Sequence, residues 1–206
     1  MAAVPVPYIG TGNQSQTVLG HYAVAQKSGL LTGWSTNADV ASIRWAPTLA
    51  NTFLILMRLK IGIVTQATAT AGVFDFLAFI ARAFTTDFTT ASTAINMSTT
   101  LKTNQMRATM NQSQMGANGP RICTVTTMSG QTATNDAAAF AAGLMNITGT
   151  TVGISSLQTI YEWTGLGQHP VVLSNNEGIR VQMPTASAGG TFNVYAQWEW
   201  AEALVF

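Results

Sequence analysis

The stretch Thr191-Phe-Asn-Val-Tyr-Ala-Gln-Trp-Glu-Trp-Ala-Glu202 decides the fold class of this chain. In an extended backbone successive side chains point to opposite faces. One face then carries Phe192, Val194, Ala196, Trp198 and Trp200, and the other carries Asn193, Tyr195, Gln197 and Glu199. This alternation is typical of a strand with one face buried, and it predicts that the chain ends inside its own sheet.

Eight further segments show a strand-like pattern and are separated by turn residues. They are Leu19–Ala25, Val40–Ala46, Thr52–Val64, Val73–Ala83, Arg121–Thr127, Ser156–Trp163, Val171–Leu173 and Ile179–Met183. Nine strands with turns between them predict an all-β fold, a two-sheet antiparallel sandwich of jelly-roll-like form. We expect residues 19–206 to form a single β-sandwich domain and residues 1–18 to form an extended N-terminal arm.

Two of the predicted strands are apolar enough to lie deep in the fold. In Thr52–Val64 one face carries Phe53, Ile55, Met57, Leu59, Ile61 and Ile63, and the N-terminal half is apolar on both faces. Such a strand is expected to be central in its sheet. Val73–Ala83 also has two apolar faces, broken only by Asp75, which we interpret as a hydrogen-bonded structural carboxylate.

Two regions lack a clear period. Between Phe84 and Gly119 we expect loops with one short helix or strand around Leu101–Met110. Its methionines, Met97, Met106, Met110 and Met115, are candidate contacts in an adaptable docking surface, and for at least half of them core packing is the favoured interpretation. Farther on, Asn135-Asp136 followed by Ala137–Ala142 and Gly143 predicts a two-turn helix, with a threonine- and alanine-rich linker as the alternative.

The other candidate contacts lie in the first 34 residues. Pro5, Pro7 and the Gly10–Gly12 turn disfavour regular structure. We therefore expect the arm, with Pro5, Pro7 and Tyr8 as contact residues, to lie on a neighbouring subunit. Its deletion is expected to weaken attachment without changing the melting temperature of the fold. Trp34, between Gly33 and Ser35 in a predicted loop, is the remaining candidate.

Composition suggests a surface made for association. Charged residues are 8% of the chain, against about 25% in ordinary soluble domains, so little charge opposes contact between copies. A neutral monomer with a threonine-rich surface is the alternative. The nine basic residues are scattered, without the basic stripe that nucleic-acid binding needs.

From the sequence we expect neither a signal peptide nor a membrane segment. The apolar run Thr52–Val64 is interrupted by Arg58 and Lys60 and is too short for a membrane helix, so no membrane partner is expected. The first residues do not have the pattern of a signal peptide, which predicts synthesis in a cytoplasm.

Residues for chemistry are sparse. His21 and His169 have no acid or cysteine at a catalytic spacing, and the single cysteine, Cys123, rules out cysteine-spaced metal clusters. We therefore expect no enzyme activity, no cofactor and no metal. The aromatic residues suit a sugar-binding platform as an alternative, although Trp45 and Trp198 have the pattern of core residues. In Leu173–Ile179 we expect a turn with a positive φ at Gly178 and a hydrogen bond from Glu177 within the turn.

Several short blocks resemble a group of virion structural proteins of tailed bacteriophages and environmental viruses. The blocks are Gly20-His21-Tyr22, Ser28-Gly29-Leu30, Ser42-Ile43-Arg44-Trp45, Arg58-Leu59-Lys60-Ile61, Phe79–Phe84, Lys102, Arg107–Met110, His169–Ile179 and Trp200-Ala201-Glu202. The resemblance covers most of residues 19–202, and the segment Gln131–Ser155 departs from it.

The resemblance implies a virion protein made in the host bacterial cytoplasm. Its expected post is that of a capsid decoration or cement protein that bridges capsomers. The expected partners are further copies of itself, with a trimer as the expected homo-oligomer, and the major capsid protein or another virion protein. A station in the neck, tail or a fibre is the nearest rival, and a carbohydrate-binding module for host attachment is the alternative from another class.

Overall fold

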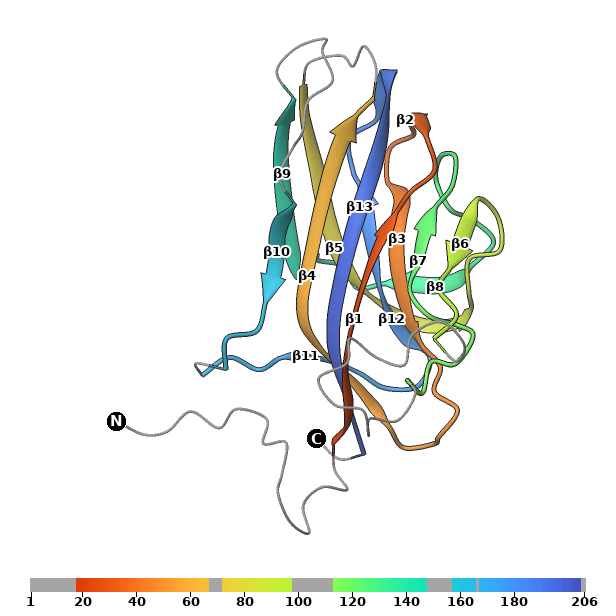
Figure 1. Ribbon diagram of the computed structural model, residues 1–206, viewed down its shortest axis with the longest axis vertical. Coiled ribbons are helices and arrows are strands. Elements are labelled where there is room, and N and C mark those ends of the chain that lie inside the picture. Colours follow the sequence, from red (N-terminus) through yellow and green to blue (C-terminus); the bar gives the residue numbers. More distant parts are fainter. Residues whose placement is uncertain (1–17, 67–71, 98–112, 148–156, 166, 205–206) are drawn as a thin grey trace.

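The computed structural model describes residues 18–66, 72–97, 113–147, 157–165 and 167–204. In these ranges the chain forms thirteen strands and no helix. The strands make two antiparallel sheets that pack as a sandwich, with β4, β13 and β1 in the layer nearest the viewer of Figure 1. The expected all-β sandwich is confirmed. The arm lies outside the described residues except for Val18, which begins the first strand.

The first sheet has six strands and is built around the C-terminal strand. Its members are β1 (Val18–Lys27), β2 (Leu31–Trp34), β4 (Phe53–Thr65), β10 (Gln158–Glu162), β11 (Val171–Leu173) and β13 (Ser187–Ala203). Strand β13 lies between β1 and β4, and its beginning also pairs with β2. Strand β4 is flanked by β13 on one side and by β10 and β11 on the other, so the prediction that it is central is confirmed.

The second sheet has seven strands. They are β3 (Ala38–Trp45), β5 (Gly72–Thr86), β6 (Ser92–Ala94), β7 (Arg121–Cys123), β8 (Thr132–Asn135), β9 (Ala141–Ile147) and β12 (Glu177–Met183). Strand β12 lies in the middle, between β3 and β5. Strand β7 ends at Cys123, four residues before the predicted strand does. Strands β2, β6 and β8 are absent from the prediction because each has only three or four residues, too few to show a period.

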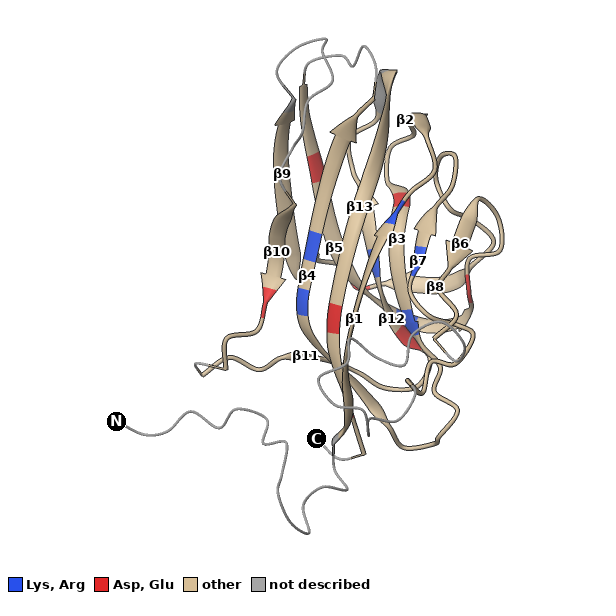
Figure 2. Cartoon of the chain, in the orientation of Figure 1, with Lys and Arg blue, Asp and Glu red and all other residues tan. Residues whose placement is uncertain are grey.

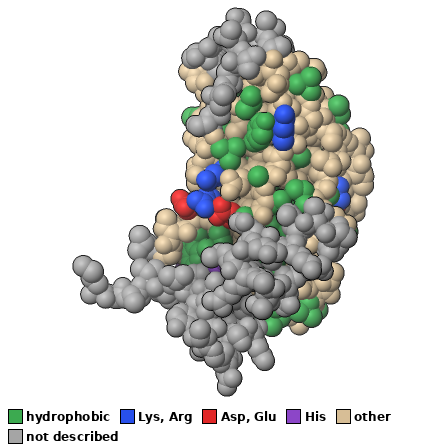
Figure 3. All heavy atoms as spheres, viewed as in Figure 1, with side chains coloured by type: hydrophobic (Ala, Val, Ile, Leu, Met, Phe, Trp, Pro, Cys, Tyr) green, Lys and Arg blue, Asp and Glu red, His purple; other side chains and the backbone are tan. Residues whose placement is uncertain are grey.

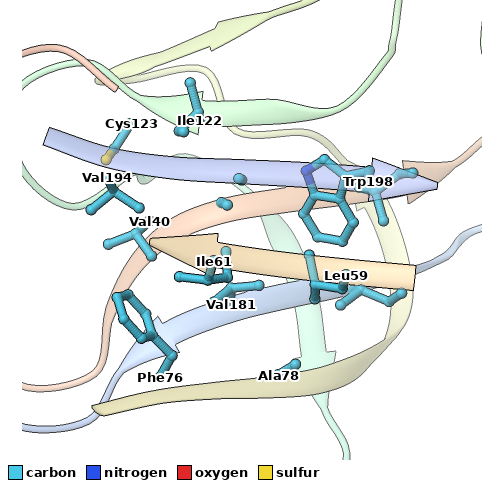
Figure 4. Close-up of a cluster of buried hydrophobic side chains, with 14 of the residues drawn as sticks. Val40, Leu59, Ile61, Phe76, Ala78, Ile122, Cys123, Val181, Val194 and Trp198 are labelled. Atoms are coloured by element: carbon cyan, nitrogen blue, oxygen red, sulfur yellow. The ribbon is translucent and has the colours of Figure 1, made fainter. Parts of the chain in front are cut away.

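The core between the sheets contains the face that the alternation of β13 predicts. Phe192, Val194, Ala196, Trp198 and Trp200 are at most 1% exposed. Figure 4 shows Val194 and Trp198 of β13 with Leu59 and Ile61 of β4 and with Val40, Phe76 and Val181 of the other sheet. Because side chains from both layers meet here, the burial of this face holds the sandwich together.

Strand β4 changes its buried face halfway along. Its pairing with β13 shifts register between Arg58 and Leu56, which leaves Met57 in a β-bulge. A bulge adds one residue to one strand and so reverses the alternation beyond it. Leu54 and Leu56 therefore face the core, and Ile55 and Met57 belong to a separate cluster. The expectation that Phe53, Ile55 and Met57 share the face of Leu59, Ile61 and Ile63 is wrong.

No helix forms where one is predicted: residues 136–140 connect β8 to β9, and the last two residues of the predicted helix begin β9. Residues 141–147 form β9, which pairs with β5 from Ala78↔Ala141 to Gly72↔Ile147. Gly143 does not end a helix but lets β9 approach β10, since a Cβ at this position would lie 2.4 Å from Cγ2 of Ile160. Hydrogen bonds to β5 outweigh the helical preference of a run of only about two turns.

The turn before β12 confirms one prediction and corrects another. The Glu177 carboxylate accepts hydrogen bonds from the backbone N–H and the hydroxyl of Ser174, both at 2.8 Å. The positive φ, 62°, belongs to Asn176 rather than to Gly178. Glycine is needed at position 178 for space, because a Cβ there would lie 2.5 Å from the Ile43 carbonyl oxygen and from the Phe84 ring.

Candidate contact surface

Trp34 is a core residue rather than a contact residue. It is the last residue of β2 and is 6% exposed, with ring centroids 4.4 Å from Phe192 and 5.2 Å from Phe74. Its indole Nε1 donates to the carbonyl of Thr185 at 2.8 Å. The prediction is wrong because Gly33, which suggests a loop in the sequence, lies in a strand paired with Ala188 of β13.

Two of the four candidate methionines, Met97 and Met115, also belong to the core. Met97 and Met115 are each 1% exposed and lie in the main apolar cluster. The contact role is therefore wrong for these two, and the core packing favoured for at least half of the four methionines holds for them. Met106 and Met110 lie outside the described residues, as do the segment around Leu101–Met110 and the arm residues Pro5, Pro7 and Tyr8.

Charges gather in a few internal networks. Figure 2 shows acidic and basic positions close together on β4, β13 and β10 of the first sheet. Six of the eight acids form ion pairs with arginines: Asp39, Asp87, Asp136, Glu162, Glu177 and Glu199. The other two are Asp75, which accepts a hydrogen bond from Thr185 as predicted for a structural carboxylate, and the buried Glu202. No acid remains free to repel or attract a partner strongly.

The most buried ion pair joins two strands of the second sheet. Arg180 of β12 donates from Nε and Nη2 to the two carboxylate oxygens of Asp39 on β3, at 3.0 and 2.5 Å. Gln182 donates to the same carboxylate, and Arg180 Nη1 reaches Oδ1 of Asn135 at 2.9 Å. The Arg180 guanidinium also lies 5.7 Å from the centroid of the Phe88 ring. The group is structural, because all its polar contacts are internal.

The remaining buried acid closes one end of the sandwich. Glu202 continues the inward face of β13 and is fully buried. Its carboxylate accepts hydrogen bonds from the Ser113 hydroxyl (2.5 Å), the Gln114 backbone N–H (2.8 Å) and the Trp200 indole (3.0 Å). Burial raises the pKa of Glu202 above its usual value, although these donors oppose the change. Burial also raises the pKa of the neighbouring Tyr22, and the negative charge of Glu202 is a second cause of that rise.

The raised pKa of Glu202 predicts that stability falls as the pH rises above the ordinary glutamate range. The folded chain holds the Glu202 proton more tightly than the unfolded chain, so unfolding releases it in this range. Denaturant unfolding at a series of pH values should show a free energy of unfolding that falls less steeply with pH in Glu202→Gln than in the wild type. Glu199→Gln, whose residue points to the opposite face, is the control and should keep the decline. Equal pH slopes in the wild type and Glu202→Gln would contradict the prediction.

An outward apolar surface lies on the second sheet where β5 and β9 pair. Val73 is 60% exposed and Leu144 is 65% exposed. They are diagonal neighbours, because Val73 pairs with Asn146 and Leu144 pairs with Asp75. Leu77 and Phe79 continue the outward face of β5 and are half-buried. We call these four residues the β5–β9 face. It corrects the expectation that Val73–Ala83 is buried on both sides.

The histidines do not form a site with acids or with Cys123. His21 lies on β1, as predicted, and His169 is exposed in the segment before β11. In the described ranges no group of three or more His, Cys, Asp or Glu residues could hold a metal ion. No helix long and apolar enough to cross a membrane occurs in that same part of the chain.

The tryptophans do not form an exposed sugar-binding platform. Trp34, Trp45, Trp198 and Trp200 are buried, and Trp163 is half-buried with its indole bonded to the Gln168 carbonyl. Tyr195 lies on the outward face of β13, but the Lys27 ammonium is 5.8 Å from its ring centroid.

Neither a scan against models of protein families nor a search of curated proteins finds a match to the chain.

Proposed function

We propose that this protein is a structural component of a bacteriophage virion, and that it serves as a capsid decoration or cement protein. The assignment to a bacteriophage particle is based on the sequence blocks that resemble virion structural proteins. The proposal rests chiefly on one structural observation: an outward apolar face on β5 and β9 in a molecule whose acids are all engaged internally.

Such a surface suits binding by shape and apolar contact. Few charges also occur on the other side of the molecule: Figure 3, which views it from the first sheet, shows red and blue atoms in only a few places on the visible described surface. Large apolar residues exposed together mark interaction sites more often than isolated ones do. A protein repeated many times on a shell needs contacts of this kind with its own copies and with the major capsid protein.

The rival stations differ in copy number and position. A decoration protein is present at every capsomer, whereas a neck, tail or fibre protein is present in few copies at one end of the particle. Cryo-electron microscopy of purified particles, with quantitative mass spectrometry of the chain, therefore tests the proposal. A regular lattice on the shell is expected. Density confined to the neck or tail would refute the decoration role, and absence from the particle would refute the virion role.

Self-association is predicted to depend on the β5–β9 face. Leu144→Lys places a charge on an exposed apolar position and should leave the fold intact. We expect it to weaken the homo-oligomer about tenfold or more, since centrally placed apolar contacts carry much of the energy of an interface. Thr85→Lys, an exposed change on β5 that lies outside the face, should not weaken it. Sedimentation velocity at micromolar concentration measures both. A monomeric wild-type chain, or equal loss in the two variants, would contradict the prediction.

A further inference from the structure

A row of residues crosses the outer surface of the first sheet. The strand pairing aligns His21 of β1 with Ala201 of β13, Ala201 with Ile55 of β4, and Ile55 with Val172 of β11. Their chain neighbours Tyr22, Trp200, Leu54 and Leu173 are buried in the main core, so these four side chains point away from it. We call them the outer row.

The outer row is covered although it lies outside the core. Ala201 is 2% exposed and Ile55 is 8% exposed, and with Ala203 they form a second apolar cluster against which Met57 and Val172 pack. Paired strands lie beside one another in the plane of a sheet and cannot shield its face from water. The low exposure of Ile55, whose neighbours in the row are the small Ala201 and Val172, therefore requires chain lying over the sheet.

His21 gives an independent sign of such a cover. Its Nε2 atom is buried and has no hydrogen-bond partner among the described residues. A buried polar nitrogen without a partner is costly, so a covering segment with polar groups at this end of the row would stabilise the fold.

From these observations we infer that the outer row is the docking site for the apolar segment 4–9 of the chain's own N-terminal arm. The segment reads Val-Pro-Val-Pro-Tyr-Ile and has no charge. Pro5 and Pro7 have no N–H to donate, so it is unsuited to extend the sheet as a further strand and suited to lie on a face through its side chains. This occupant differs from the neighbouring subunit that the sequence alone led us to expect.

Length and position agree with this occupant. The arm joins β1 at Val18, which pairs with Ala203 at the edge of the covered cluster. The outer row spans three interstrand gaps, roughly 14 Å, and six residues in an extended proline-rich conformation span roughly 19 Å. Residues 10–17 connect the two and reach up to about 28 Å. Their threonine, asparagine, glutamine and serine side chains carry hydrogen-bonding groups of the kind that His21 Nε2 lacks.

Segment 98–112, which also lies outside the described residues, is a poorer match in its sequence. Residues 98–112 are polar and include Lys102 and Arg107. The chain that follows them is tied to the opposite side of β13, because Ser113 and Gln114 bond to the inward-pointing Glu202.

Thiol labelling in the full-length chain tests the docking site. Ala201→Cys places a reporter in the row, and the exposed Ala25→Cys on the same face of β1 is the reference. The native Cys123 is silent, because burial raises its pKa to about 12. In the Ala201→Cys chain, adding Val6→Asp and Ile9→Asp together should raise the rate of reaction with Ellman's reagent at least about tenfold. Adding Asn13→Asp, which introduces charge outside the apolar segment, should change it less than about twofold.

Three results would overturn the inference. Labelling of Ala201→Cys as fast as that of Ala25→Cys would mean that the row is uncovered. Protection that persists in the Val6→Asp, Ile9→Asp chain would mean that another segment covers it. Protection that disappears on dilution would assign the cover to a neighbouring copy's arm. If Ala201→Cys does not fold, Val172→Cys reports on the same row. None of these outcomes depends on whether the protein belongs to a virion.

Discussion

Trp198→Ala is expected to lower the free energy of unfolding by about 3–5 kcal/mol. Trp198 is fully buried between the two sheets, where it packs with Leu59 and other core residues. Removing the indole leaves a cavity lined by both layers, which can close only by moving strands. The loss is a large share of the roughly 5–15 kcal/mol that stabilises a typical domain. Urea unfolding followed by circular dichroism measures it.

Two further variants separate lost packing from lost polar contacts. The Trp198 Nε1 atom is buried and has no hydrogen-bond partner among the described residues, so Trp198→Phe removes an unsatisfied donor as well as some volume. We expect it to cost less than half as much as alanine. Trp163→Ala, at a half-buried position, is the control and should cost less than Trp198→Ala. A fully stable Trp198→Ala variant would contradict the assignment of this face to the core.

Asp39→Ala is expected to destabilise the fold by a similar amount, about 3–5 kcal/mol, because it leaves the Arg180 guanidinium buried without its counter-ion. Both side chains are less than 10% exposed, and the pair is bidentate. Replacing both charges, in Asp39→Leu with Arg180→Met, should recover much of the loss, since an apolar pair needs no counter-ion. Thermal and denaturant unfolding of the single and double variants give the coupling energy.

A surface ion pair provides the matched control. Arg82 pairs with Asp136 at 3.1 Å, but its side chain is 52% exposed. Solvent screens this contact, so Arg82→Met should cost no more than about 1 kcal/mol. If Arg82→Met were as destabilising as Asp39→Ala, burial would not explain the difference between the pairs. If the double variant lost as much stability as Asp39→Ala, the unpaired charge of Arg180 would not be the cause of the loss, and the prediction would be wrong.

Elements with a long, regular pattern could be predicted from local sequence. The inward face of β13 and the central place of β4 follow from which residues are apolar, because burial on one or both faces leaves a period in the chain itself. The β5–β9 face could not be found in this way. Val73–Ala83 is apolar on both faces, and only the position of the second layer determines which face is left to solvent.

The candidate site residues were harder to predict than the fold. Trp34, Met97 and Met115 stand in irregular sequence that resembles exposed loops, yet all three pack into the main core. Irregular segments can cover a sandwich and bury their larger side chains. Because such segments have no regular period, the sequence pattern does not indicate which of their side chains are buried. Asp39 and Arg180 are 141 residues apart, so no spacing rule could have paired them.

The sequence by itself determined that this is a β protein with an inward-facing C-terminal strand, because a two-residue period is a local property of the chain. Only the tertiary structure decided that residues 141–147 form a strand, since the hydrogen bonds that favour it come from β5. Only the register of β4 against β13 decided that Met57 forms a bulge and that Ile55 faces outward. The strand at residues 141–147 and the bulge at Met57 both depend on pairing with strands that are distant in sequence. The contacts that stabilise them exist only once the sheets have assembled.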